Sequence, residues 1–309
     1  MRAKLLTPAL AGCLLVLTGC EYEDWGGVRR TKDFHFNYPL KSGSRVSVES
    51  FNGSVEISGW DQETVDISGT KYAPSDDLLE SLKIDVSSRP DSVTVRAIRP
   101  SGTRGNLGAR FIIKVPRQSQ LDRVVSSNGS VRVLDVDGPV RLKTSNGSIR
   151  AQNLKGELDA QTSNSSVEVQ GLDGSARVHT SNGHVRAEEV RGSVEASTSN
   201  SSIHVNLVKT DPGRPIRLET SNGGVELTLP PDTRNDVRVS TTNSGITVHG
   251  AAGLNARVIA HTSNSKITTD FEIRTQGEVS KNRLEGTIGN GGSLLDLSTS
   301  NGSIKLLRM

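Results

Sequence analysis

Carboxylate groups are the first residues of this chain to consider for chemistry, because a pair of acids at a suitable separation can cleave a glycosidic bond. Here the acids are kept apart by cations at positions 18 residues from one another: Asp137, Lys155, Asp173 and Arg191. Glu188 and Glu189 are adjacent, so in an extended strand they face opposite sides. We therefore keep a polysaccharide-cleaving enzyme only as an unfavoured alternative.

Histidine and serine residues offer no clearer chemistry. His179 and His261 occupy equivalent repeat positions but are four repeats apart, roughly 19 Å at the spacing of stacked strands. The sequence has no zinc-ligand spacing, no motif for a nucleophilic serine and no glycine-rich phosphate loop. We expect no catalytic residue, no metal and no cofactor.

Both cysteines belong to the N-terminal segment. Arg2 and Lys4 begin it, and the apolar run that follows, Leu5 to Leu17, is too short to span a membrane as a stable helix. The stretch from Leu17 to Cys20 resembles the lipobox of a bacterial lipoprotein, which predicts a signal peptide over 1–19 and acyl chains on Cys20. The alternative is an ordinary secretory peptide that happens to contain a cysteine. Cys13 would leave with the signal, and residues 20–32 would form a tether to the folded body.

The elements that position the other side chains are short strands repeated at a fixed interval. Near-copies of the stretch from Thr144 to Ile149, Thr-Ser-Asn-Gly-Ser-Ile, return through more than half of the chain. Such a period predicts an all-β fold, a single-stranded β-helix or β-solenoid with coils of roughly 18–22 residues, which we expect to be right-handed. The repeated asparagines are Asn128, Asn146, Asn164, Asn182, Asn200, Asn222, Asn243, Asn264 and Asn301.

The alternation within one coil predicts which side chains face inward. Val140, Leu142 and Thr144 share one phase, so the threonine joins the apolar interior. Continued to Asn146, this phase places the amide at an inner corner, where asparagines about 4.8 Å apart would form a buried hydrogen-bonded ladder. The alternative is that each asparagine supplies a turn before glycine and is solvated.

Charged residues take the outward phase and mostly alternate in sign between coils. Opposite charges side by side on neighbouring strands fix the register, so we interpret these columns as structural. The 37 basic residues less Arg2 and Lys4 leave 35 against 34 acidic residues, so we expect no nucleic-acid partner. The columns read Arg123, Arg141, Asp159, Arg177, Glu195 and Arg217, and Arg132, Arg150, Glu168, Arg186, His204 and Glu226.

Two sections differ in regularity. Residues 33–127 alternate less evenly and form an irregular first section, with one short helix expected after Ser75 as N-cap. Residues 128–309 form the regular coils. The gap between Asn264 and Asn301 equals about two coils, so we expect a degenerate coil around Asn282.

Aromatic residues are absent from the regular coils between 112 and 270. If the protein binds a partner through aromatic side chains, the candidates are Phe51, Trp60 and Tyr72, or Phe271 near the other end. The favoured interpretation is that these aromatics close the open ends of the core.

The repeated Thr-Ser-Asn-Gly-Ser-Ile signature resembles a bacterial domain family of unknown function described as putative adhesins. Val115-Pro116, Gly59-Trp60-Asp61 and Leu229-Pro230 strengthen the resemblance, which covers about 33–309. It implies a β-solenoid on membrane-anchored or exported proteins and offers no catalytic residues to transfer.

Together these observations favour a non-enzymatic, lipid-anchored cell-envelope solenoid that acts as an adhesin-like or scaffold module. The expected partners are a membrane, through the lipid, and an envelope protein or glycan. Glu21 after the lipidated cysteine favours the outer membrane where the cell has one, and otherwise the outer face of the cytoplasmic membrane. The main alternative is an envelope-stress sensing or regulatory lipoprotein that acts through the irregular section.

Overall fold

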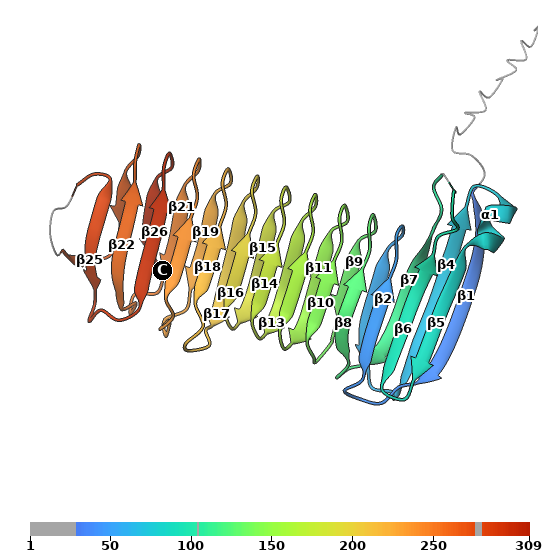
Figure 1. The fold of residues 1–309 in the computed structure, drawn as a ribbon. Helices are drawn as coiled ribbons and strands as arrows, with labels where there is room; N and C mark the ends of the chain where they lie inside the picture. Colours follow the sequence, from blue (N-terminus) through green and yellow to red (C-terminus); the bar gives the residue numbers. More distant parts are fainter. Residues whose placement is uncertain (1–28, 104, 276–279) are drawn as a thin grey trace, which may run out of the picture.

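The structure, a computed structural model, describes residues 29–103, 105–275 and 280–309. These residues form an elongated solenoid in which two long sheets face each other along the body (Figure 1). Sheet A has 13 strands and sheet B has 14. The all-β solenoid expected from the repeat is confirmed.

The strands of sheet A, in spatial order, are β1 (Arg30–Pro39), β4 (Thr64–Ala73), β7 (Gly108–Pro116), β3 (Val55–Trp60), β9 (Val131–Leu134), β11 (Ile149–Lys155), β13 (Val167–Asp173), β15 (Val185–Arg191), β17 (Ile203–Lys209), β19 (Val225–Leu229), β21 (Ile246–Gly250), β27 (Ile304–Arg308) and β23 (Ile267–Thr269).

The strands of sheet B, from the same end, are β5 (Lys83–Arg89), β6 (Ser92–Ile98), β2 (Arg45–Glu49), β8 (Gln120–Val125), β10 (Val140–Lys143), β12 (Leu158–Gln161), β14 (Ala176–His179), β16 (Val194–Ser197), β18 (Ile216–Glu219), β20 (Val237–Ser240), β26 (Leu294–Thr299), β22 (Ala256–Thr262), β25 (Arg283–Ile288) and β24 (Ile273–Thr275). The one helix of the described ranges, α1 (Asp76–Ser81), begins after Ser75, whose hydroxyl accepts a hydrogen bond from the N–H of Leu78, as expected.

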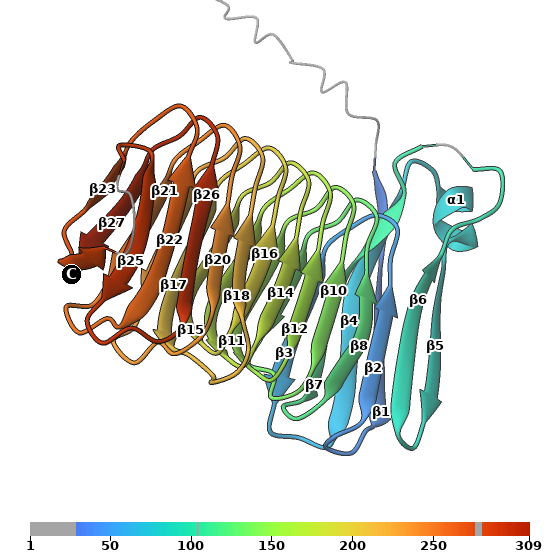
Figure 2. The ribbon, with the colours of Figure 1, turned by 60° about the vertical axis from the view of Figure 1, so that its left-hand side comes forward.

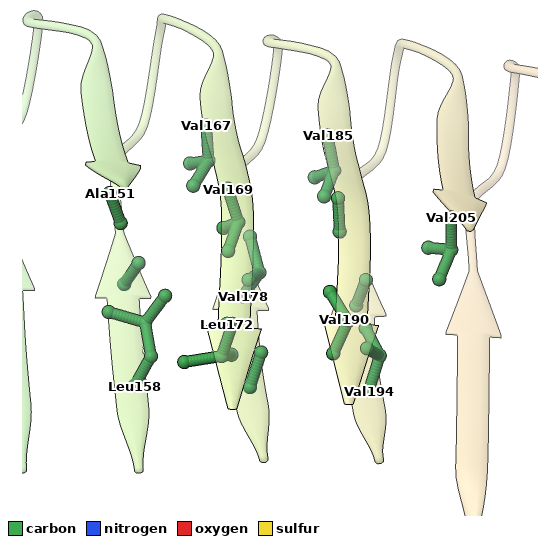
Figure 3. Packing of buried hydrophobic residues seen from close by; sticks show 14 of the residues in the cluster. Ala151, Leu158, Val167, Val169, Leu172, Val178, Val185, Val190, Val194 and Val205 are labelled. Carbon is green, nitrogen blue, oxygen red and sulfur yellow. The ribbon is translucent and has the colours of Figure 1, made fainter. Parts of the chain in front are cut away.

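Each regular coil contributes one strand to each sheet. Val140 of β10 lies opposite Leu158 of β12, and Ile149 of β11 opposite Val167 of β13, so neighbouring coils are in parallel register at a period of 18 residues. The inward positions are Val, Ile, Leu and Ala, and their side chains meet between the two sheets (Figure 3). This narrow interior needs no aromatic residue, because the facing strands lie close enough for branched aliphatic side chains to fill it.

The last coil in the sequence is not the last coil in space. β26 lies between β20 and β22, and β27 lies between β21 and β23 (Figure 2). Leu295 is therefore opposite both Val237 and Val258. The coil that contains Asn264 is pushed outward by one layer, although it precedes β26 and β27 in the chain.

The segment before this inserted coil forms the C-terminal cap. β24 and β25 are antiparallel, and β25 also pairs antiparallel with β22. The prediction of a degenerate parallel coil around Asn282 is therefore wrong, and the regular coils do not continue unbroken to 309. The physical reason is that an end layer has to cover the core, which antiparallel strands achieve here with Phe271, 8% exposed.

The N-terminal end repeats this arrangement. β2 and β3 are the first coil in the sequence, but they lie between β6 and β7 on one side and β8 and β9 on the other. Val55 is opposite both Phe111 and Val131. β1, β4 and β5 form the outermost antiparallel layer. β1 begins at Arg30, so residues 30–32, expected in the tether, belong to the first strand.

Candidate interaction surface

The threonine of each repeated corner is buried and ties neighbouring coils together. Thr180 donates its hydroxyl hydrogen to the carbonyl oxygen of Ser165 in the preceding coil (3.0 Å) and accepts a hydrogen bond from the N–H of Gly183 (3.2 Å). The same donation to the preceding corner is made by Thr144, Thr162, Thr198, Thr220, Thr241, Thr262 and Thr299. The hydroxyl thus satisfies backbone groups that would otherwise be buried without a partner.

The asparagines form a ladder, but on the outside of the corner. The amide of Asn182 donates to the side-chain oxygen of Asn164 at 2.8 Å and accepts from Asn200 at 2.7 Å. The row runs, in spatial order, through Asn52, Asn128, Asn146, Asn164, Asn182, Asn200, Asn222, Asn243, Asn301 and Asn264.

The expectation of a buried asparagine ladder is wrong, because all nine repeated asparagines are exposed. The strand phase does not continue through the corner: the chain turns after Thr144, and Ser145 and Asn146 both point outward. In the coils where glycine follows the asparagine, the glycine packs against the corner of the preceding coil in space, where a side chain would not fit. A Cβ at Gly183 would lie 1.8 Å from the carbonyl oxygen of Ser165.

Some of the outward charges pair between coils, as the alternation predicts, and others do not. Arg150 contacts Glu168 at 3.0 Å on sheet A, and Arg177 contacts Glu195 at 3.4 Å on sheet B. On sheet A a longer chain of contacts links Arg186, Glu188, His204, Glu226 and His249 at 3.1–3.2 Å. These exposed pairs favour the observed register rather than marking an isolated binding group.

A depression lies on sheet B across β10, β12, β14 and β16. The segment between β17 and β18 reaches back along the stack, and Arg214 contacts Glu157 at 3.0 Å. Beneath it lies a cavity of about 370 Å³ whose charged lining residues are Arg141, Glu157, Asp159, Arg177, Glu195 and Arg214.

Two of these lining residues form no ion pair with the rest of the described chain. Arg141 and Asp159 are register partners, yet within the described residues neither forms an ion pair, and Asp159 Oδ1 is buried without a hydrogen-bond partner. A buried polar oxygen without a partner costs free energy, so this position favours a ligand that brings a donor. The periodic pattern of charges in the sequence identified Arg141 and Asp159, but it did not predict that the segment between β17 and β18 encloses them.

The three aromatic candidates do not form one site. Phe51 packs against a small cluster of Leu79, Leu82 and Leu107, with the Arg99 guanidinium 5.5 Å above its ring. Trp60 lies at the far end of β3 and donates its indole N–H to the carbonyl of Thr64 at 2.8 Å. The Tyr72 ring lies 3.5 Å from the Arg29 guanidinium carbon. Each is half-buried with a protein partner, so a shared partner-binding site of these residues is not supported.

The N-terminal end of the core is hollowed. A cavity of about 370 Å³ lies between β1 and β5, with Phe34, Phe36, Ile84 and Ile98 among its walls. At its rim Lys71 donates to the carbonyl oxygens of Leu79 and Leu82 at 3.0 and 2.9 Å, which caps the end of α1. Burial lowers the pKa of Lys71, and nearby Lys32 acts in the same direction while Glu80 opposes it.

Metal and membrane features are limited to what the described ranges contain. Across residues 29–103, 105–275 and 280–309, no three His, Cys, Asp or Glu side chains gather where they could hold a metal ion. No helix in this part of the chain is long and apolar enough to cross a membrane. Cys20, the signal peptide and most of the tether lie outside the described residues.

The fold and its faces define a class of protein: a repetitive β-solenoid with charge-patterned sides. The chain belongs to the Toastrack DUF4097 family, whose model matches residues 43–255. The resemblance inferred from the repeat is confirmed in this form.

The chain is similar to solved structures at low sequence identity. A putative adhesin from Parabacteroides merdae is 11% identical, with 92% of this chain and 97% of that chain covered and a TM-score of 0.50. A putative adhesin from Bacteroides fragilis is 14% identical, with 90% and 97% covered and a TM-score of 0.47. No curated protein matches the chain.

Proposed function

We propose that the protein is a non-enzymatic, lipid-anchored module of the cell envelope that binds a polar partner on the outer face of sheet B. The partner class is an envelope glycan or protein. The adhesin description of the Parabacteroides merdae structure agrees with this assignment.

The observation that carries the proposal is the pair Arg141 and Asp159 in the cavity beneath Arg214. Arg150 and Glu168 on sheet A are an example of register partners that neutralise each other. In the cavity a cation and a carboxylate stand side by side without pairing, and Asp159 Oδ1 lacks a donor among the described residues. Hydroxyl and amide groups of a glycan or a peptide supply both donors and acceptors, which suits this combination.

The rest of the molecule supports a display role. Stacking at about 4.8 Å per strand makes sheet A about 58 Å long from its first to its last strand. The apolar core, the corner threonines and the asparagine ladder stabilise the stack along this length. The predicted acyl anchor on Cys20 would keep the solenoid on a membrane surface.

A binding experiment tests the proposal. The chain from residue 20 onward, carrying Cys20→Ser, is immobilised and probed with a glycan array and with solubilised envelope fractions. Wild type is compared with the double variant Arg141→Ala and Asp159→Asn, and with Arg132→Ala on sheet A as a matched control. We expect retention of a defined glycan or protein by wild type and by the control, and loss in the double variant.

Two results would contradict the proposal. Equal retention by all three proteins would show that the cavity does not contribute to binding. Release of soluble sugar products during incubation would instead show catalysis.

A further inference from the structure

Asparagine followed by glycine is a chemically labile pair, and this sequence contains it seven times. The backbone nitrogen of the second residue can attack the side-chain amide carbon of the asparagine, and glycine has no Cβ to hinder that approach. One of the seven pairs is Asn290-Gly291. The other six belong to the exposed ladder and begin at Asn52, Asn128, Asn146, Asn182, Asn222 and Asn301.

The ladder corners restrain both groups that would have to react. At Asn182 the amide donates to Asn164 at 2.8 Å and accepts from Asn200 at 2.7 Å. The N–H of Gly183 donates to Thr180 Oγ1 at 3.2 Å. Ring closure requires the amide carbon and the glycine nitrogen to approach to bonding distance, so it has to break hydrogen bonds at both of them.

Asn290 lies in the turn between β25 and β26, where the side chain is not restrained in this way. It is exposed, and within the described ranges its side-chain amide has no hydrogen-bond partner, although its backbone N–H donates to Asn255 at 2.7 Å. The N–H of Gly291 closes the turn by donating to the carbonyl of Ile288 at 3.1 Å. Gly291 and Gly292 have φ of 79° and 134°, and glycine moves easily between such conformations. The turn can therefore rearrange without disturbing a neighbouring coil.

We propose that Asn290 is a site of spontaneous deamidation and that the ladder protects the other six pairs from the same reaction. A bond forms between the nitrogen of Gly291 and the side-chain carbon of Asn290. The bond from that carbon to Nδ2 breaks, and ammonia leaves with the proton of the attacking nitrogen. Water then opens the five-membered imide at either carbonyl and yields aspartate or isoaspartate. Water is the only other reactant.

The same reaction would affect the fold differently at the two kinds of position. A carboxylate at Asn182 would have no hydrogen to donate to Asn164, so the ladder would lose a bond. A carboxylate at Asn290 would form next to Gly289, whose carbonyl oxygen accepts a hydrogen bond from the Arg274 guanidinium. Deamidation there adds a negative charge to the C-terminal cap, close to a cation, and leaves the ladder intact.

Peptide mapping by mass spectrometry measures each pair separately. The chain from residue 20 with Cys20→Ser is incubated in mildly alkaline buffer, once folded and once in urea, where the local sequence alone sets the rate. We expect Asn290 to react at similar rates in both conditions. The six ladder pairs should react more slowly in the folded chain than in urea, by more than about tenfold, because each has to wait for a local opening of the corner.

A double variant separates the ladder from the rest of the fold. Asn164→Ala with Asn200→Ala removes both amide partners of Asn182 and changes only exposed side chains. The rate at Asn182 in the folded chain should then rise several-fold towards its rate in urea. The rate at Asn301 should stay the same, because its partners Asn243 and Asn264 are unchanged.

Three results would overturn the proposal. An Asn290 that reacts as slowly as Asn182 in the folded wild type would show that the turn is not the labile position. An unchanged rate at Asn182 in the double variant would show that the ladder does not protect it. A rise at Asn301 in the same variant would assign the protection to global folding. The glycan-binding experiment is independent of all three.

Discussion

Asn301 donates its side-chain amide hydrogen to the side-chain oxygen of Asn243, 58 residues earlier, at 2.9 Å. Asn264, which stands between them in the sequence, stacks on the far side and donates to Asn301 at 2.7 Å. The row of asparagines therefore records the spatial order of the coils, which differs from the order in the chain at the C-terminal end.

The inserted coil should be as stable as an internal one. Leu297 is fully buried on β26, so Leu297→Ala should lower the free energy of unfolding by about 2–4 kcal/mol. Ile267→Ala on the edge strand β23, where the side chain is only partly buried, should cost about 1 kcal/mol. Urea denaturation measures both. Equal small losses would mean that the last coil is not held between two neighbours.

The two side chains of one corner should contribute unequally. Thr180→Val leaves the carbonyl of Ser165 and the N–H of Gly183 without their buried partner, so we expect a loss of about 2–4 kcal/mol. Asn182→Ala removes exposed hydrogen bonds that water can replace and should cost about 1 kcal/mol or less. Thermal and urea unfolding of both variants, with Thr180→Ser as the hydroxyl-retaining control, checks the order. A larger effect at Asn182 would reverse this assignment.

A substitution at one backbone position, Glu189, should raise the stability of the fold. Glu189 has φ of 55°, in the left-handed region that favours glycine, and Gly171 holds the corresponding position one coil earlier at 67°. Glu189→Gly should therefore raise stability by about 0.5–1 kcal/mol. Glu188→Gly, in the adjacent extended position, should lower it by a similar amount. A loss at both positions would indicate that the Glu189 side chain matters more than its backbone angle.

The contact between His35 and Asp66 should make stability depend on pH in the acid range. The hydrogen bond from His35, with a second from Asn37, lowers the pKa of Asp66 below its ordinary value of 3.8, and burial opposes the shift. A carboxylate with a lowered pKa stabilises the folded state above its ordinary pKa, and this contribution is lost as the pH falls through the lowered value. Asp66→Asn should therefore be less stable than wild type at neutral pH, and the difference should vanish in strong acid. Paired urea titrations at several pH values measure it, and a difference that persists unchanged in acid would show that the Asp66 charge is not its source.

The repeat could be predicted from the sequence because each coil of a solenoid has the same strands, turns and core positions, and so needs similar residues at them. Period, inward valines and leucines, buried threonines and alternating charges all follow from strand phase. The position of Asn146 did not follow, because phase counting assumes an extended chain and the chain turns after Thr144.

The order of the terminal coils was missed for a different reason. Strand pairing between distant segments leaves no mark on local periodicity. One signal was present: from Gly147 onward, the residue after each ladder asparagine alternates glycine and serine in spatial order. Chain order breaks this alternation, and spatial order restores it, as Gly147, Ser165, Gly183, Ser201, Gly223, Ser244, Gly302 and Ser265.

The cavity beneath Arg214 could not be predicted from the repeat pattern of the sequence either. Its lining comes from four neighbouring strands of sheet B together with the segment 210–215, which is longer than the corresponding turn in the coils of 18 residues. The charges of Arg141 and Asp159 looked like another register pair, and only the enclosing loop sets them apart.

The placement of the C-terminal coil has a mechanical consequence. β27 is bonded to β21 on one side and β23 on the other, so a pull on the C-terminus loads two ladders of hydrogen bonds at once. A strand at the end of a stack would instead peel away from a single neighbour. A force applied through β27 would therefore have to break both ladders before the solenoid opened there.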